Sequence, residues 1–195
     1  MSAKQITRDD IMDMDAYRDI RVQKRKDLVA VKKDRRVHLG PHATFYFENY
    51  DTMWLQVHEM LFIEQGGEEQ IADELEAYNP LIPQGNELVT TLMFEIDNEV
   101  QRRAFLSKLG GVEETCYIKV GDEKIIGIAE EDVDRTTADG KASSVQFLHF
   151  PFTDAQVAAF KDEATEVILG IGHESYPHMV ALTAANRAAL AKDFD

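Results

Sequence analysis

The spacing of apolar and charged residues predicts a long helix at the start of the chain. Residues 7–37 contain neither glycine nor proline and are rich in charge. At about 100° per residue, one arc of this helix is apolar and holds Tyr17, Ile20, Leu28 and Val31. The neighbouring arc holds Val22 and Val29 together with five cations: Arg18, Arg21, Arg25, Lys32 and Arg36. Gly40-Pro41 is the expected end of the helix.

The next segment, GPHATFYFENYDTMWLQVHEMLFIEQ, predicts a strand followed by a helix. Residues 43–50 are rich in aromatic side chains, as strands are. Asp51 or Thr52 can cap a helix that runs to Glu64, and residues 68–78 predict a second, shorter helix. On the first helix the expected buried arc also contains Glu64, whereas Glu59 falls on the polar side.

Beyond residue 86 the pattern alternates between strand and helix. The clean alternation of ELVTTLMFEI predicts a strand at 87–96, and a polar loop is expected at 130–143. The remaining predicted elements are a helix at 98–109, a strand pair at 115–130 turning at Gly121-Asp122, a strand at 144–152, a helix at 153–163, a strand at 164–173 and a helix at 183–194.

This order predicts an α+β protein. We expect the long N-terminal helix and the following helical segment to pack on a mainly antiparallel sheet, with a C-terminal part somewhat like a ferredoxin-type sandwich. The proline-containing loop NPLIPQGN suggests a boundary near residue 85, with a helical segment at 1–85 and a sheet segment at 86–195. The length of 195 residues favours one compact domain overall.

Charge is distributed unevenly along the chain, whose net charge is −15. Residues 1–41 carry eleven Lys and Arg and seven Asp, a net charge of +4, which leaves −19 for residues 42–195. So acidic a body disfavours nucleic acid as a partner.

The single cysteine, Cys116, lies in a strand-like run and is expected to be a buried, inert thiol. With no membrane-spanning run and no signal peptide in the pattern, we expect a cytoplasmic protein.

The basic arc of the N-terminal helix is a candidate surface for an anion or a partner. The candidate binding residues on this arc are Arg18, Arg21, Arg25 and Arg36, since guanidinium groups bind carboxylates and phosphates well. The alternative is a solvated face, or one paired with acids elsewhere in the chain. Glu64 and Glu95 are the acids expected to form such structural ion pairs.

A metal site is a second candidate. Carboxylates and imidazoles suit Fe, Mn or Zn, and the candidate ligands are Glu48, Asp51, His58, Glu59 and His173. On a helix, however, His58 and Glu59 project about 100° apart, so a site needs ligands from other elements such as His173. Glycine-rich phosphate loops, GxGxxG, GxSxG and CxxC motifs do not occur, which disfavours nucleotide, dinucleotide and serine-hydrolase chemistry.

Two segments carry a resemblance to a known family: KKDRRVHLGPHATFYFENYDTMWLQVHEML and EAYNPLIPQGNELVTTLMFEI. With SVQFLHF and GHESYPH they resemble the bacterial family called domain of unknown function 3501. The likeness spans nearly the whole chain and implies a shared fold without a known activity. Genes of this family often lie beside those for rubrerythrin and a heterodisulfide-reductase-like iron–sulfur protein. The resemblance therefore suggests that the protein acts in a cytoplasmic redox or peroxide-stress system, with these two proteins as its partners.

Three functions remain open from the sequence. The first is a non-catalytic accessory protein that binds a redox partner or forms a homo-oligomer through complementary charged surfaces. The second is a small Fe-, Mn- or Zn-dependent enzyme built on the candidate ligands. The third is a sensor of a small anion or metabolite that uses Arg18, Arg21 and Arg25.

Overall fold

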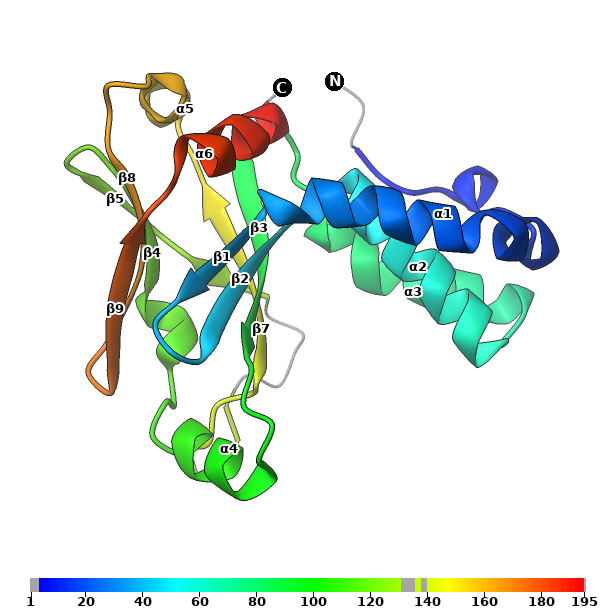
Figure 1. Cartoon of the computed structure of the whole chain (residues 1–195), viewed down its shortest axis with the longest axis horizontal. Helices are drawn as coiled ribbons and strands as arrows, with labels where there is room; N and C mark the ends of the chain where they lie inside the picture. The colour runs from blue at the N-terminus through cyan, green and yellow to red at the C-terminus, as the bar shows by residue number, and fades with distance from the viewer. Residues whose placement is uncertain (1–3, 131–135, 138–139, 195) are drawn as a thin grey trace.

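Two antiparallel sheets and a projecting arm of helices make up the described part of the chain, residues 4–130, 136–137 and 140–194 of this computed structural model (Figure 1). The expected α+β class with antiparallel strands is confirmed. Of the loop expected at 130–143, residues 131–135 and 138–139 lie outside the described residues.

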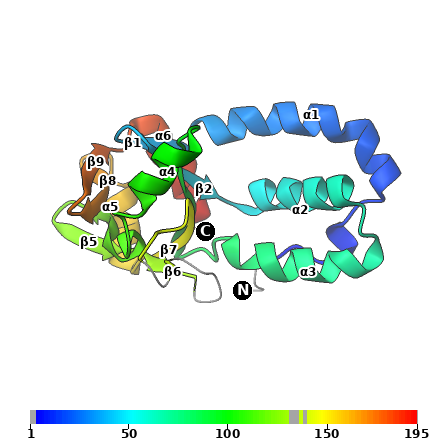
Figure 2. The ribbon, with the colours of Figure 1, turned by 90° about the horizontal axis from the view of Figure 1, so that it is seen from below.

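The arm consists of α1 (Met14–Lys33), α2 (Tyr50–Glu64) and α3 (Glu68–Tyr78), with α2 lying between the other two (Figure 2). Each of the first two helices begins at a capped residue. The Asp13 side chain accepts hydrogen bonds from two backbone N–H groups of α1, and Asn49 caps α2. A hydrophobic cluster fills the space between the helices; its buried members are Ile6, Ile11, Met53, Val57, Leu61, Ile71, Leu81, Ile82 and Val89.

The long helix ends earlier than the sequence pattern suggests. After α1 the chain turns into strand β1 (Arg36–Leu39), which pairs antiparallel with β2 (Ala43–Glu48). Val37 and Leu39 are buried on one face of β1, and this burial makes a strand more favourable than another helical turn. Gly40, at φ +65°, belongs to the hairpin turn and does not terminate the helix as we expected.

The strands form two sheets where the sequence suggested one ferredoxin-like layer. The first sheet has the order β1-β2-β3-β7-β6, in which the new strands are β3 (Glu87–Phe94), β7 (Val145–Pro151) and β6 (Ile128–Ala129). The second has the order β5-β4-β8-β9, formed by Glu123–Ile126, Cys116–Val120, Val167–His173 and Tyr176–Ala181. The predicted hairpin at Gly121-Asp122 joins β4 to β5, but β9 was not predicted.

The two sheets join along both of their edges. On one side the chain passes from β5 to β6 through Gly127, so consecutive strands belong to different sheets. On the other side Tyr176 of β9 reaches the β1–β2 turn. Its hydroxyl donates to the carbonyl of Leu39 at 2.6 Å and accepts from the backbone N–H groups of His42 and Ala43 at 3.0 and 3.1 Å.

Short helices cover the two ends of this body. α4 (Glu99–Leu106) lies at one end, and α5 (Asp154–Lys161) and α6 (Ala184–Leu190) lie at the other (Figure 1). Four 3-10 turns complete the described elements, at Arg8–Asp10, Asn79–Leu81, Val112–Thr115 and Ala191–Asp193. Among the described residues, no helix combines the length and the apolar character needed to cross a membrane.

The first sheet separates two hydrophobic cores. Leu88 and Leu92 of β3 face the core between the sheets, whereas Val89 on the opposite face belongs to the core of the arm. The expected boundary at residue 85 therefore divides a continuous sheet, because β2 pairs with β3 along its whole length. Cys116 is fully buried in the core between the sheets, where burial raises its pKa, as expected for an inert thiol.

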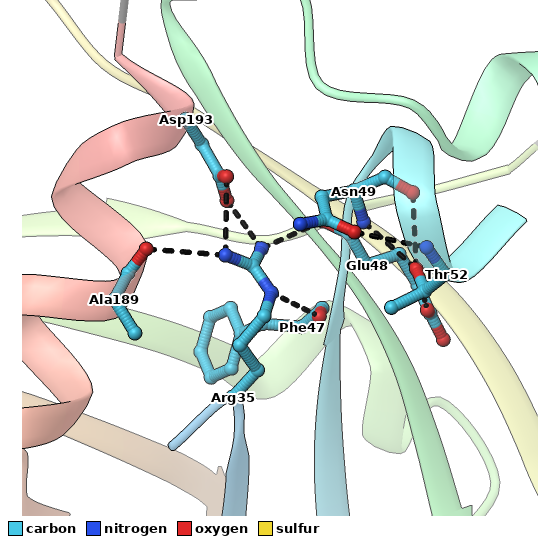
Figure 3. Close-up of polar contacts among 7 residues, drawn as sticks. All are labelled: Arg35, Phe47, Glu48, Asn49, Thr52, Ala189 and Asp193. Carbon is cyan, nitrogen blue, oxygen red and sulfur yellow. Dashed lines mark hydrogen bonds and ion pairs between the residues drawn. The ribbon is translucent and has the colours of Figure 1, made fainter. Parts of the chain in front are cut away.

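Arg35 ties the base of the arm to the C-terminal segment (Figure 3). Its guanidinium forms a buried ion pair with Asp193, with N–O distances of 2.5 and 3.1 Å. The remaining N–H groups donate to the carbonyls of Phe47, Glu48 and Ala189. All five donors of the guanidinium therefore have acceptors, which makes this buried charge tolerable.

Candidate functional site

Tyr17 of α1 occupies the centre of the arm. Its ring is fully buried and contacts Trp54, His58 and Phe62 of α2, with ring centroids 5.0–6.1 Å apart. Aromatic pairs at these distances contribute to stability beyond the area that they bury. This cluster fixes α1 against α2 and so determines which side chains of α1 face outward.

His58 is a buried member of this cluster, although its position on the helix predicted an exposed polar side. It is 0% exposed, and its ring stacks on Trp54 at 3.8 Å. Its Nδ1 lies 2.7 Å from the carbonyl of Trp54 and must donate, while Nε2 accepts from the backbone N–H of Met12. Burial lowers the pKa of His58, so the ring is neutral and both of its nitrogens are occupied.

Glu59 binds the basic helix α1. Arg21 contacts both carboxylate oxygens, at 2.7 and 2.8 Å, and the hydroxyl of Tyr17 donates to the same carboxylate at 2.7 Å. Arg25 lies 4.0 Å away. The hydrogen bonds from Arg21 lower the pKa of Glu59, while burial and the bond to Glu59 raise the pKa of Tyr17. Glu59 is thus the ionic partner of α1, the role that we expected of Glu64.

The residues expected to form ion pairs make hydrogen bonds instead. Glu64 is exposed and accepts from the side-chain amide of Gln70 at 2.7 Å. Glu95 accepts from the hydroxyls of Thr44 and Tyr46 at 2.6 and 2.7 Å, which lowers its pKa. Within the described residues, neither acid lies within ion-pair distance of an arginine.

The candidate metal ligands are distributed over separate places. Glu48 is buried at the end of β2 and accepts from Thr52 and Thr91, while Asp51 is exposed on the first turn of α2. His173 lies at the end of β8 in the second sheet, where its Nδ1 accepts from the backbone of Ser175. Nowhere in the described ranges do three or more His, Cys, Asp or Glu side chains converge as metal ligands.

The exposed side of α1 is both apolar and basic. Val22 and Val29 are 65% and 70% exposed and lie seven residues apart, on nearly the same line of the helix. Arg18 and Arg25, 60% and 58% exposed, border that line on the side nearer α2, where Arg18 forms an exposed ion pair with Asp15 at 2.7 Å and Arg25 lies 4.0 Å from Glu59. Lys26, also exposed, borders it on the other. We call these five residues the outer face of α1.

Arg36 does not belong to this surface. It lies on β1, beyond the end of α1, with its guanidinium 4.8 Å from the centre of the Tyr46 ring. The four arginines grouped from the sequence thus have three environments. Arg18 and Arg25 are on the outer face of α1, Arg21 is bound to Glu59, and Arg36 lies on the sheet.

A cleft of about 400 Å³ lies at the free end of the arm, next to Arg18. Its walls are mixed: the apolar part is formed by Ile11, Met12, Met14, Leu61, Phe62 and Ile71, and the polar part includes Arg8, Asp13, Arg18, Gln65 and Glu68. Arg8 and Glu68 close one side as an exposed ion pair. Arg18 is the residue of the outer face of α1 that lines this cleft.

Sequence reasoning missed the pairing of Arg35 with Asp193 and the surroundings of His149. His149 on β7 is hydrogen-bonded by Glu87 at Nδ1 and by Glu130 at Nε2, at 2.9 and 2.7 Å. Burial alone would lower its pKa, but the two carboxylates outweigh burial and raise it. Because these partners are distant in sequence, no local pattern pointed to either group.

Comparison with known proteins agrees with this architecture. Residues 5–194 match the family described as "Protein of unknown function (DUF3501)". The chain belongs to this family. A crystal structure of a novel protein of unknown function from Burkholderia pseudomallei shares the DUF3501 fold at a TM-score of 0.90 and 38% sequence identity, over 98% of this chain and 100% of the other. No curated protein matches this DUF3501 chain.

Proposed function

We propose that this DUF3501 protein is a non-catalytic accessory protein that binds an acidic partner protein through the outer face of α1. The observation that carries the proposal is the exposure of Val22 and Val29 beside Arg18 and Arg25. An apolar centre with a charged rim is the usual composition of a protein–protein interface.

Electrostatics support an acidic partner and a defined orientation. Residues 42–195, which form α2 and α3 of the arm as well as most of the body, carry a net charge of −19 and repel an acidic surface. The arm projects away from that body, which leaves α1 accessible (Figure 2). Opposite charges at the contact and like charges elsewhere would speed association and exclude other orientations.

The internal bonds of the arm favour binding over catalysis. His58 uses both ring nitrogens inside the protein, and the carboxylate of Glu59 is held by Arg21 and Tyr17. A general base needs a free lone pair within reach of substrate. A sensor that used Arg21 to bind a small anion would first have to displace Glu59.

We assign the partner to a cytoplasmic redox or peroxide-stress system. The support for this class is the resemblance of the chain to a family whose genes often accompany those of rubrerythrin and a heterodisulfide-reductase-like iron–sulfur protein. These two proteins are therefore the first candidates for binding. The surface chemistry adds that the contact region on either partner should be acidic.

Charge reversal on α1 tests the proposal. We expect the double variant Arg18→Glu, Arg25→Glu to lose the capture of rubrerythrin or the iron–sulfur protein by affinity-tagged protein, because like charges would then face each other. The matched control is Arg103→Glu with Lys108→Glu, which reverses two exposed charges on and just after α4. Equal capture by both variants would contradict the proposal, and thermal melts of each variant show that the fold is intact.

A further inference from the structure

The third helix of the arm carries a surface complementary to the outer face of α1. Glu69, Asp73 and Glu76 of α3 are exposed and follow a spacing of four and three residues, with exposed Ala72 among them. They therefore lie along one side of the helix. We call these four residues the outer face of α3.

Two other acids of α3 already have partners within the chain. Glu68 pairs with Arg8, and Glu74 accepts from the amide of Gln70. In contrast, none of the three acids on the outer face forms an ion pair or hydrogen bond with another described residue. The outer face of α3 thus carries three negative charges that have no partner among the described residues.

The two outer faces match in spacing as well as in charge. Arg18 and Arg25 are seven residues apart, as are Glu69 and Glu76, which is about 10.5 Å along a helix axis. Two helices laid side by side would therefore place both arginines opposite both glutamates in one register. The small side chain of Ala72 would leave room for Val22 or Val29.

The two faces cannot meet within one molecule. α2 lies between α1 and α3 and packs against both (Figure 2). The Arg21–Glu59 bond further fixes α1 on its side of α2. The acidic outer face of α3 is therefore available only to another molecule.

We infer that the outer face of α1 binds the outer face of α3 of a second copy of this chain, so that the protein self-associates through its arm. The inference rests on the proposed function in one respect, since it uses the same surface of α1. An interface between two different surfaces is heterologous, so each added copy can offer a further free face. Self-association would also cover the partner-binding surface and so compete with the partner.

Analytical ultracentrifugation of the purified protein with a pair of charge-swapped variants tests the inference. We expect the mass of the wild type to rise above the monomer with concentration at low salt, and to return to the monomer at about 1 M salt, where the screening length is about 3 Å. The variant Arg18→Glu, Arg25→Glu and the variant Glu69→Lys, Glu76→Lys should each associate at least about 100-fold more weakly alone. Mixed together, they should associate again, because each α1 then meets an α3 of opposite charge.

Two outcomes would overturn self-association: a wild type that stays monomeric at every concentration, or a mixture of variants that does not associate. A wild type that stays monomeric and still captures its partner in an α1-dependent way would overturn self-association alone. The opposite combination would overturn only the proposed function. In that case the single variants lose self-association and their mixture restores it, but charge reversal on α1 leaves partner capture unchanged.

Discussion

Arg35 is a buried charge whose partners come from two separate segments of the chain, the end of β2 and the C-terminal residues 189–193. Its side chain is 4% exposed, as is appropriate for a group with acceptors for all five N–H donors. Removing such a charge leaves its partner desolvated and unpaired, and that loss costs more than the net energy of the pair.

We expect Arg35→Ala to lower the free energy of unfolding by about 3–5 kcal/mol, because Asp193 would remain buried without its cation. The neighbouring substitution Arg36→Ala removes an exposed guanidinium and should change the free energy of unfolding by no more than about 0.5 kcal/mol. Urea unfolding of both variants measures the difference. Equal stabilities would show that the buried pair does not hold the C-terminal segment.

Two histidines should respond to pH in opposite directions. The pKa of His58 is lowered by burial, whereas that of His149 is raised by Glu87 and Glu130. His58 therefore destabilises the fold as pH falls below about 6.5, since the unfolded chain then binds the proton more readily. The stabilising contribution of His149 to the fold is fully present below about pH 6.5 and is lost as the pH rises through the pKa of His149 in the folded protein.

NMR titration of the imidazole protons checks this pair of expectations. His149 should titrate above about pH 6.5 and His58 below it. Glu87→Gln should move the titration of His149 downward and leave that of His58 unchanged, since Glu87 contacts only the first of the two. A His58 that titrates with an ordinary pKa would contradict its burial in the aromatic cluster.

Single helix positions were harder to predict than helix existence. The apolar arc of α2 placed Glu59 on a polar side, yet α2 packs against α1 and α3 on two flanks. A helix covered on two flanks has no single solvent-facing side, so a polar position such as 59 can face a neighbouring helix. Of the basic arc predicted for α1, Arg18 and Arg25 lie beside the exposed Val22 and Val29, whereas Arg21 is bound to Glu59 and Arg36 lies on β1.

At the scale of elements, the seam between β1 and β9 closes one side of the body through Tyr176. The hydroxyl of this residue satisfies three backbone groups of the β1–β2 turn. Gly40 permits that approach, since a Cβ there would lie only 2.6 Å from the hydroxyl. The contact between β9 and the β1–β2 turn therefore depends on both Gly40 and Tyr176.

Tyr176→Phe should lower the free energy of unfolding by about 1–3 kcal/mol and speed amide exchange at Ala43, because the turn loses its hydrogen-bond partner. Tyr117→Phe is the control, as its hydroxyl makes no hydrogen bond to another described residue. We expect a change of no more than about 0.5 kcal/mol there. Exchange rates that do not differ between the variants would show that the seam is held by other contacts.

Strands were predicted where apolar and polar residues alternate, and missed where other features hid the alternation. β3 and β7 followed directly from their patterns. β1 was hidden because it follows a charge-rich helix with no glycine or proline between them, and β9 because Pro177 lies within it. Alternation also carries no information on pairing, so one sheet could not be distinguished from two.

At the scale of the whole molecule, the division of charge seen in the sequence corresponds to a division in space. The basic segment forms one edge of a projecting arm, and the acidic residues form the body and the opposite edge of that arm. An arm that offers one cationic and one anionic helix face can bind an acidic partner, a second copy, or each in turn. This arrangement makes recognition, rather than chemistry at a buried site, the central function that we propose for the protein.

Site-specific photocrosslinking in the native cell tests that claim most directly. A photoreactive amino acid at position 22, on the outer face of α1, is compared with one at position 100 on α4, where valine is even more exposed at 78%. We predict a covalent adduct with a partner protein from position 22 and none from position 100. Adducts of equal yield from both positions, or none from position 22, would contradict the assignment of α1 as the binding surface.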